Sequence, residues 1–180
     1  MHNLIWLTGY RGSGKSAVGE IVARRLGWEF VDADQYIEFV AGVTVRDIFQ
    51  VQGERGFRDL EARVTRELSA RHDCVIATGG GVVLREENRK VLTDTGLVVW
   101  LRAPARVLLE RIEADPSTAQ RRPDLTATGG LAEIETLLFL REPMYRKIAV
   151  VDLDTSKLSP EEVADRILAL WNPSTTTSPG

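Results

Sequence analysis

The chain has 180 residues, 43% of them hydrophobic, and its 26 acidic and 23 basic residues leave a formal net charge of −3. A chain of this length buries about 70% of the surface that it exposes when unfolded, so one domain needs no disulfide or structural metal. The mixed charges give no continuous basic stripe for nucleic acid or anionic lipid, and no apolar stretch reaches the ~18 residues of a membrane span, so the expected partner is a small molecule.

The first predicted element is a strand, Leu4–Thr8, which leads directly into a phosphate-binding loop. Residues 9–16 read G-Y-R-G-S-G-K-S, and a helical pattern follows. In such a loop backbone N–H groups surround a phosphate chain, the lysine reaches the β- and γ-phosphates, and the serine hydroxyl binds Mg²⁺. We therefore predict that Lys15 is catalytic and Ser16 ligates the metal. The predicted phosphate-binding residues are Gly12, Ser13, Gly14, Lys15, Ser16 and Ala17.

Strands and helices alternate along the rest of the chain. Further strands are predicted at Glu29–Val31, Cys74–Ala77, Leu97–Leu101 and Ala149–Leu153. Apolar runs of strand length that alternate with helical periodicity indicate βαβ units and a parallel sheet. The long stretch between the second and third strands has room for about two or three helices, and such an insertion is well placed to carry a substrate pocket.

Two carboxylates, Asp32 and Asp34, stand where the second strand is predicted to end. Ligands of open α/β sheets bind at the carboxyl ends of the strands, and residues two apart on an extended segment point the same way. We expect Asp32 to serve Mg²⁺ and Asp34 to contact a substrate hydroxyl. In the alternative interpretation Asp34 is simply the N-cap of the following helix.

The third strand ends in a run of glycines, Gly79, Gly80 and Gly81. Three consecutive glycines suit a place where the backbone comes close to a ligand, although they also suit an ordinary turn. The only cysteine, Cys74, lies in the same apolar strand and is expected to be a buried small hydrophobe. The lone cysteine and the early first strand favour a cytoplasmic protein.

Three arginines are candidates for ligand contacts. Arg58 has glutamates three and four residues away, so by itself it suggests a surface ion-pair ladder, and Arg141 by itself suggests a solvated charge. Arg122 lies in a long loop, 115–130, which we predict to be a lid. A cation on such a loop is able to close over a phosphoryl group during its transfer.

The last helix is predicted from Ser159-Pro160-Glu161-Glu162, a capping box with proline at the first helical position. Its expected buried stripe is Val163, Ile167, Leu170 and Trp171. The tail, 173–180, is rich in Ser, Thr, Pro and Gly and is expected to be disordered. Residues 1–172 are therefore predicted to form a single domain.

In combination these motifs resemble the shikimate kinase family. They occur in that family's order: the phosphate loop, Asp-x-Asp, the Gly-Glu-x-x-Phe-Arg-x-x-Glu segment at 53–61, the glycine run, Arg-Pro in the lid, and Arg-x-Pro-x-Tyr at 141–145. The resemblance implies a three-layer α/β/α phosphate-loop kinase fold with a lid and five parallel strands in the order 2-3-1-4-5. It also implies that ATP and shikimate are the substrates and that the product belongs to aromatic amino-acid biosynthesis.

The resemblance assigns roles to the residues that were ambiguous alone. Arg58 and Arg141 occupy the family's positions for clamping the substrate carboxylate, together with Gly79, Gly80 and Gly81. Asp34 orients the attacking hydroxyl, Asp32 and Ser16 serve Mg²⁺, and Arg122 joins Lys15 in binding ATP and neutralising charge on the phosphoryl group. We expect a monomer.

One departure and two rival functions stay open at this point. The family usually follows its lid Arg-Pro with two leucines, whereas Asp124 and Leu125 stand here. A dephospho-coenzyme A kinase pairs a similar loop with a similar Asp-Ala-Asp, but it leaves the 53–61 segment and the glycine run unexplained. A nucleotide-binding module without turnover gives the acceptor arginines no role.

Overall fold

The computed structural model describes residues 3–115 and 129–171, and within these ranges five parallel strands form one sheet in the order β2-β3-β1-β4-β5. The order confirms the predicted topology. The strands are β1 (Leu4–Thr8), β2 (Glu29–Asp32), β3 (Cys74–Ala77), β4 (Leu97–Arg102) and β5 (Val151–Asp154).

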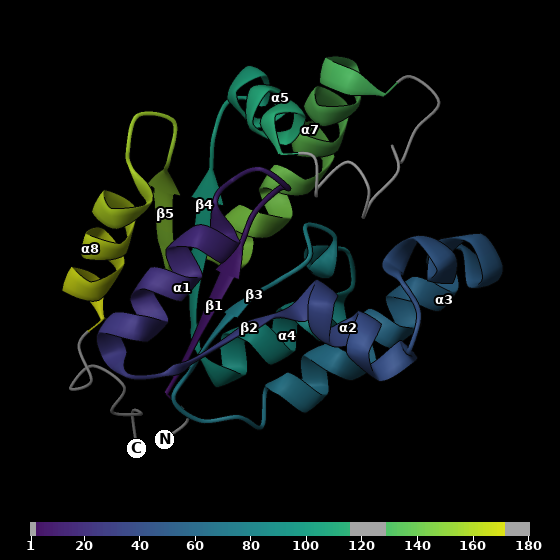
Figure 1. The fold of residues 1–180 in the computed structure, drawn as a ribbon, viewed down its shortest axis with the longest axis horizontal. Coiled ribbons are helices and arrows are strands. Elements are labelled where there is room, and N and C mark those ends of the chain that lie inside the picture. The colour runs from purple at the N-terminus through teal and green to yellow at the C-terminus, as the bar shows by residue number, and fades with distance from the viewer. Residues whose placement is uncertain (1–2, 116–128, 172–180) are drawn as a thin grey trace.

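Helices cover both faces of the sheet, which gives the predicted three layers (Figure 1). α1 (Lys15–Leu26) and α8 (Pro160–Leu170) cover one face; α3 (Val45–Leu68), α4 (Glu86–Thr95) and α7 (Gly130–Ile148) cover the other. α2 (Ala33–Ala41) packs on α3, and α5 (Ala105–Ala114) packs on α7. A 3₁₀ turn, Val82–Leu84, follows the glycine run.

The residues of β1 explain its place in the middle of the sheet. Leu4 and Trp6 belong to the hydrophobic cluster under α3, α4 and α7, while Ile5 and Leu7 belong to the cluster under α1 and α8. Successive side chains of a strand point to opposite faces, so a strand that is buried on both sides must be apolar throughout. β1 meets this condition and pairs with both β3 and β4.

The expected boundaries of β5 are partly wrong. The strand begins at Val151 rather than Ala149, because α7 runs to Ile148 and the Ala149 amide still donates to the carbonyl oxygen of Tyr145.

The expected buried stripe of α8 is also partly wrong. Leu170 is 53% exposed, whereas Ala164 is fully buried beside Val163 and Ile167. The stripe continues one position later, at Trp171, which makes an edge-on contact with Trp28. Four residues after Ile167 is the next position on the same face of a helix, so Trp171 follows on and Leu170 lies at its margin.

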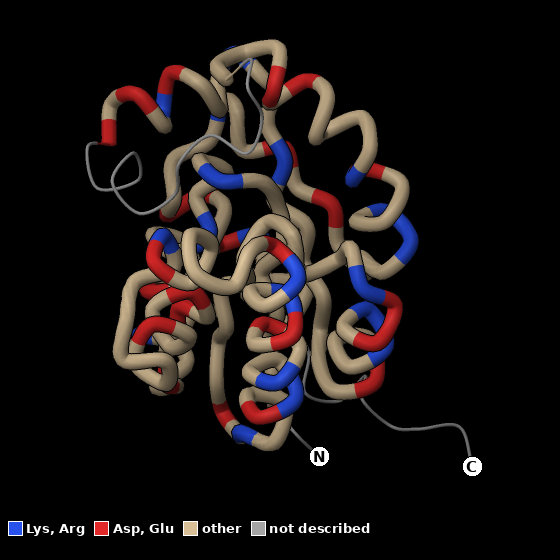
Figure 2. Tube along the Cα trace, turned by 90° about the vertical axis from the view of Figure 1, so that its right-hand side faces the viewer, with Lys and Arg blue, Asp and Glu red and all other residues tan. Residues whose placement is uncertain are grey.

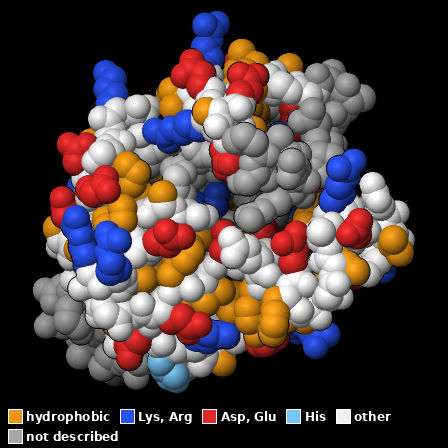
Figure 3. Space-filling view, viewed as in Figure 1, with side chains coloured by type: hydrophobic (Ala, Val, Ile, Leu, Met, Phe, Trp, Pro, Cys, Tyr) orange, Lys and Arg blue, Asp and Glu red, His pale blue; other side chains and the backbone are white. Residues whose placement is uncertain are grey.

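Charges of both signs are interspersed along the described residues (Figure 2) and over the face of the molecule that Figure 3 shows. None of the helices in these ranges is long and apolar enough to cross a membrane. Cys74 is fully buried in β3, and burial raises the pKa of its thiol to about 11. Arg122, most of the predicted lid and the predicted tail lie outside the described residues.

Candidate active site

The loop between β1 and α1 depends on its glycines. Gly9, Gly12 and Gly14 have φ angles of 137°, 79° and 94°, a region that residues with a side chain rarely adopt. A Cβ atom at Gly9 would lie 2.2 Å from the carbonyl oxygen of Leu101 on β4. Within the loop the amide of Ser13 donates to the carbonyl oxygen of Tyr10 at 3.2 Å. The loop therefore packs tightly on the sheet and turns directly into α1, whose N-terminus favours an anion.

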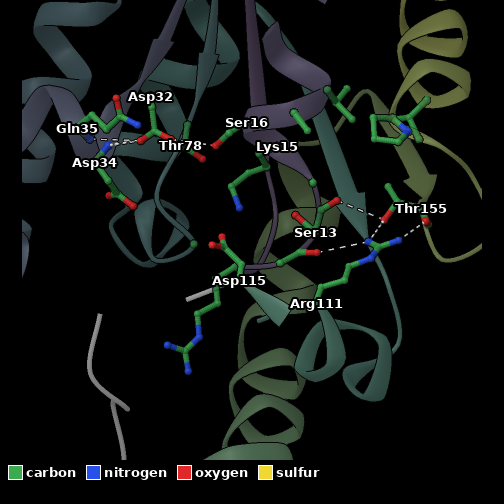
Figure 4. Close-up of a pocket in the computed structure, with 18 of the residues that line it drawn as sticks. Ser13, Lys15, Ser16, Asp32, Asp34, Gln35, Thr78, Arg111, Asp115 and Thr155 are labelled. Atoms are coloured by element: carbon green, nitrogen blue, oxygen red, sulfur yellow. Dashed lines mark hydrogen bonds between the residues drawn. The ribbon is translucent and has the colours of Figure 1, made fainter. Parts of the chain in front are cut away.

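This loop forms one wall of a pocket of about 550 Å³. The residues predicted to bind phosphate, 12–17, all line it. Asp32, Asp34 and Gln35 lie on one side of the pocket, Arg111 and Thr155 lie on the other, and the Lys15 side chain lies between them (Figure 4). The pocket thus opens where β2 and β5 end, as the rule for open α/β sheets requires.

Lys15 carries its positive charge within this pocket. Its Nζ donates to the carbonyl oxygens of Gly9 and Tyr10, each at 2.9 Å. These contacts hold the ammonium group over the loop, close to the N-terminus of the helix that Lys15 begins. A cation beside a helix N-terminus is a combination that suits a polyphosphate.

Ser16 and Asp32 provide oxygen atoms that fit Mg²⁺. The Ser16 hydroxyl donates to Oδ2 of Asp32 at 2.9 Å, so the two oxygens lie side by side at the pocket wall. No cluster of three or more acidic, histidine or cysteine side chains suited to a metal occurs in the ranges 3–115 and 129–171. Mg²⁺ in kinases takes one or two protein oxygens and fills its octahedron with phosphate and water, so the pair Ser16 and Asp32 fits such a site.

The reasoning that placed Asp32 and Asp34 together on an extended segment is wrong. β2 ends at Asp32, and Asp34 is already in the first turn of α2. The cap is Asp32 rather than Asp34, because Oδ1 of Asp32 accepts from the amides of Asp34 at 3.0 Å and Gln35 at 3.3 Å. Asp32 therefore fixes the start of the helix that carries Asp34 to the pocket wall.

Arg58 is buried, so its interpretation as part of a surface ladder is wrong. Its side chain is 7% exposed and donates to Oε2 of Glu61 at 2.7 Å, and the Glu61 side chain is only 4% exposed. A second, weaker pair joins Arg58 to the exposed Glu54 at 3.3 Å. The backbone at Gly53 breaks the helical geometry of α3 just before this segment. A Cβ atom at Gly81 would lie 2.3 Å from the guanidinium nitrogens of Arg58, so the arginine lies directly against the glycine run.

Arg141 is also buried rather than solvated, and it reaches the same glycine run from α7. Its Nη1 donates to the carbonyl oxygen of Gly80 at 3.3 Å, and the buried Tyr145 hydroxyl donates to the same oxygen. Burial raises the pKa of Tyr145, which keeps the phenol protonated as this donor. Within the described residues Arg141 forms no salt bridge to a carboxylate, in contrast to Arg58. Its charge is therefore available to an anionic ligand.

Gly80 is the point where the two groups of residues meet. It lines the phosphate pocket, and its carbonyl oxygen holds Arg141 and Tyr145. Gly79, Gly81, Arg58 and Arg141 do not line that pocket themselves.

Sequence reasoning missed two residues that brace the phosphate loop, Arg111 on α5 and Thr155 directly after β5. Nη1 of Arg111 donates to the carbonyl oxygen of Gly12 at 3.3 Å and to the Thr155 hydroxyl at 3.0 Å, and Nη2 donates to the Thr155 carbonyl oxygen at 2.7 Å. The Thr155 hydroxyl in turn donates to the carbonyl oxygen of Ser13 at 3.3 Å. Thr155 directly follows β5, so the strand-end rule could have found it; no local pattern marks Arg111.

Comparisons with known proteins agree with this geometry. The shikimate kinase family model matches residues 11–171. A shikimate kinase of Rhodopirellula baltica is 42% identical over 164 residues, which cover 91% of this chain and 88% of the relative. One of Chromobacterium violaceum is 44% identical over 163 residues, with 91% and 86% covered. The solved structure of a shikimate kinase from Acinetobacter baumannii in complex with shikimate matches with a TM-score of 0.89 at 36% identity, over 98% of this chain and 97% of that one.

Proposed function

This chain belongs to the shikimate kinase family, and from this premise we propose that it transfers the γ-phosphoryl group of ATP to the 3-hydroxyl group of shikimate. One observation carries the proposal: the phosphate pocket and two buried arginines meet at Gly80. A phosphoryl donor on the loop and a carboxylate-bearing acceptor on the arginines would therefore be neighbours. The product is an intermediate of aromatic amino-acid biosynthesis.

The acceptor carboxylate binds Arg58 and Arg141. A guanidinium group offers paired donors that match the two oxygens of a carboxylate. Arg141 supplies a charge that no carboxylate among residues 3–115 and 129–171 pairs with, while Arg58 is held in place by Glu61 and by the close approach of Gly81. The glycine run, 79–81, lets the acceptor come close to the backbone.

The donor phosphates bind the loop. Gly12, Ser13, Gly14 and Ala17 contribute backbone N–H groups, and Lys15 contributes its ammonium charge. Ser16 and Asp32 would hold Mg²⁺, which when bound would supply positive charge to the donor phosphates.

Asp34 and Arg122 complete the proposed chemistry. Asp34 lies at the wall of the phosphate pocket on α2, where its carboxylate orients the attacking hydroxyl and accepts its proton. Arg122 belongs here through the resemblance of its Arg-Pro segment to the family, and it neutralises charge on the phosphoryl group in flight. Accordingly Arg122→Ala lowers kcat by about 100-fold and shifts the KM of the acceptor less than about threefold.

A coupled assay of ADP release tests the proposal, with shikimate, dephospho-coenzyme A or no acceptor added. We expect turnover that depends on Mg²⁺ and on shikimate. Asp34→Asn, which keeps the shape of the side chain and removes the base, should lower kcat by at least about 100-fold. Turnover with dephospho-coenzyme A alone, or ADP release that is equal with and without acceptor, contradicts the proposal. A cytoplasmic location and a monomeric state remain predictions, and gel filtration tests the second.

A further inference from the structure

Arg11, the third residue of the phosphate loop, forms an ion pair with a buried carboxylate of α7. Its Nη2 lies 3.5 Å from Oε1 of Glu133, whose side chain is completely buried, while the Arg11 side chain is 18% exposed. Arg11 also lines the phosphate pocket. A buried carboxylate needs a nearby positive charge, and here the loop that holds the phosphates provides one.

Tyr10, the residue before Arg11, extends this attachment. Its side chain is buried in a small hydrophobic cluster with Leu108 and Ile112 of α5 and Ile134 of α7. The loop is therefore attached to α7 twice, by the packing of Tyr10 beside Ile134 and by the ion pair of Arg11 with Glu133.

The same Tyr10 ring also contacts the acceptor side of the site. The guanidinium carbon of Arg11 lies 6.0 Å from the ring centroid, and that of Arg141 lies 5.9 Å from it. Both distances fall within the range of cation–π attraction. One aromatic side chain thus lies between the residue that pairs with Glu133 and the arginine proposed to bind the acceptor.

Glu133 and Arg141 are both buried residues of α7. Eight positions along a helix correspond to a rise of about 12 Å, and continuous helical backbone joins the two residues. Fixing the loop against Glu133 therefore fixes the loop relative to Arg141. Reaction rates depend steeply on such placement, since a misplacement of about 1 Å costs up to about 100-fold.

We propose that Arg11 and Glu133 are positioning residues, which hold the phosphate loop against α7 and so set the separation between the donor phosphates and the acceptor bound at Arg141. The inference deepens the proposed function and rests on it. Neither residue needs to touch the reacting atoms. Their effect is therefore expected in kcat, with both substrates saturating, more than in either KM.

The test uses Arg11→Met, Glu133→Gln and the double variant Arg11→Met/Glu133→Leu. We expect each single variant to lower kcat by at least about fivefold, while the KM values for ATP and shikimate change by less than about threefold. The double variant replaces the pair by apolar side chains, so it should regain thermal stability that the single variants lose. Its kcat should stay as low as in the single variants, because the loop is no longer held.

The matched control is the ion pair of Arg25 on α1 with Asp165 on α8, which also joins two elements but lies outside the pocket lining. Arg25→Met and Asp165→Asn should leave kcat within about twofold. The proposal is overturned when the single variants lose less than about fivefold in kcat, or when the double variant recovers kcat together with stability. Should a single variant fail to fold, the kcat of the double variant decides: a loss of less than about fivefold overturns the proposal.

A measurement without substrate separates failure of this inference from failure of the proposed function. Wild-type protein that shows no shikimate-dependent turnover contradicts the function and leaves the attachment to be decided by hydrogen exchange. Amides of residues 9–13 should exchange at least about fivefold faster in Glu133→Gln than in wild type or Asp165→Asn. Equal exchange in the three proteins overturns the attachment of the loop through Glu133.

Discussion

The donor half of the site is made from one continuous stretch of backbone, whereas the acceptor half is made from charged side chains that come from separate helices. The phosphate loop runs from β1 into α1, and its glycines set its path. The acceptor half brings Arg58 on α3 and Arg141 on α7 against the end of β3. In the first half most ligand contacts are expected from backbone N–H groups, which a change of side chain other than to proline leaves in place.

This difference determines where each half is vulnerable. Within the loop itself the donor half depends on the charge of Lys15, on glycine conformations and on braces behind the loop. The acceptor half depends on each of its buried charges, and one of these charges is already paired with Glu61 while the other is not. Substitutions should therefore affect the two halves separately, and the following predictions are ordered from the largest expected effect to the smallest.

Lys15→Met should lower turnover by at least about 100-fold, because the variant loses a preorganised positive charge beside the phosphates. Stability should change far less than turnover, since Lys15 is not one of the residues of the buried core. ADP release measured beside a thermal melt checks both statements. Turnover within about threefold of wild type would contradict the assignment of the donor half.

Arg58→Ala and Arg141→Ala should each weaken shikimate binding by about 2–5 kcal/mol, with much smaller effects on ATP. The two variants should differ in thermal stability. Arg58→Ala breaks the 2.7 Å ion pair with the buried Glu61 and should lower Tm by at least about 2–4 °C, whereas Arg141→Ala breaks no carboxylate pair among the described residues. Calorimetric titration with each substrate and thermal melts measure these quantities. ATP affinity that falls as much as shikimate affinity would place the arginines in the donor half instead.

Gly81→Ala should raise the KM of shikimate by about tenfold and leave the KM of ATP unchanged. The new Cβ would lie 2.3 Å from the guanidinium nitrogens of Arg58, which must then move away from its position. The effect is smaller than in Arg58→Ala because the charge-assisted contact of Arg58 with shikimate is displaced and not removed. Steady-state kinetics with each substrate varied in turn provide the test, and an equal change in both KM values would count against it.

Arg111→Met should weaken nucleotide binding by about fivefold and leave shikimate binding unchanged. The variant loses the hydrogen bonds that tie the Gly12 carbonyl oxygen to Thr155, while the loop backbone remains. Calorimetric titration with ADP and with shikimate distinguishes the two halves. A larger loss for shikimate than for ADP would contradict the assignment of Arg111 to the donor side.

The smallest expected effect concerns Cys74 on β3, the strand that leads to the glycine run where both halves meet. Burial raises the pKa of the Cys74 thiol from its ordinary value of 9.0 to about 11. The folded state therefore binds the thiol proton more tightly than the unfolded state, so this contribution to stability is complete below pH 9 and is lost as the pH rises towards 11. Cys74→Ala should flatten the dependence of Tm on pH above pH 9. Alkylation of the native protein at pH 8 should be slow, and rapid modification would contradict the burial.

The sequence allowed prediction where the cause of a structure is local. The apolar run of β1, the glycines of the loop and the capping box at Ser159 all act on neighbouring residues, and the order of the sheet followed from the resemblance of the motifs to a family. Asp32 and Asp34 were predicted at the right end of β2 but with the wrong local geometry, because the helix already begins at Ala33 and Asp34 is helical rather than extended.

Prediction failed where the cause is long range. Arg58 has the sequence spacing of a surface ladder, and only the packing of α3 against the glycine run buries it. Arg111 and Thr155 act through contacts between residues 44 positions apart, and Thr155 reaches Ser13 across 142 positions. In the sequence Glu133 looks like an exposed helical glutamate. Only the packing of α7 against the phosphate loop buries it and pairs it with Arg11. Of these, Arg111 and Glu133 carry no local pattern that a single sequence reveals, whereas the strand-end rule could have found Thr155.

The central place of β1 has a consequence for the order in which the protein is made. Leu4 pairs with Cys74, and Ile5 pairs with Leu97, so β1 leaves the ribosome well before either of its neighbours in the sheet. At roughly 5–20 residues per second, the loop waits several seconds before the sheet exists on both sides of it. A nascent chain that already contains the complete loop should therefore not yet retain nucleotide. Binding should begin once β4 has emerged, which makes the nucleotide a late participant in folding rather than a template for it.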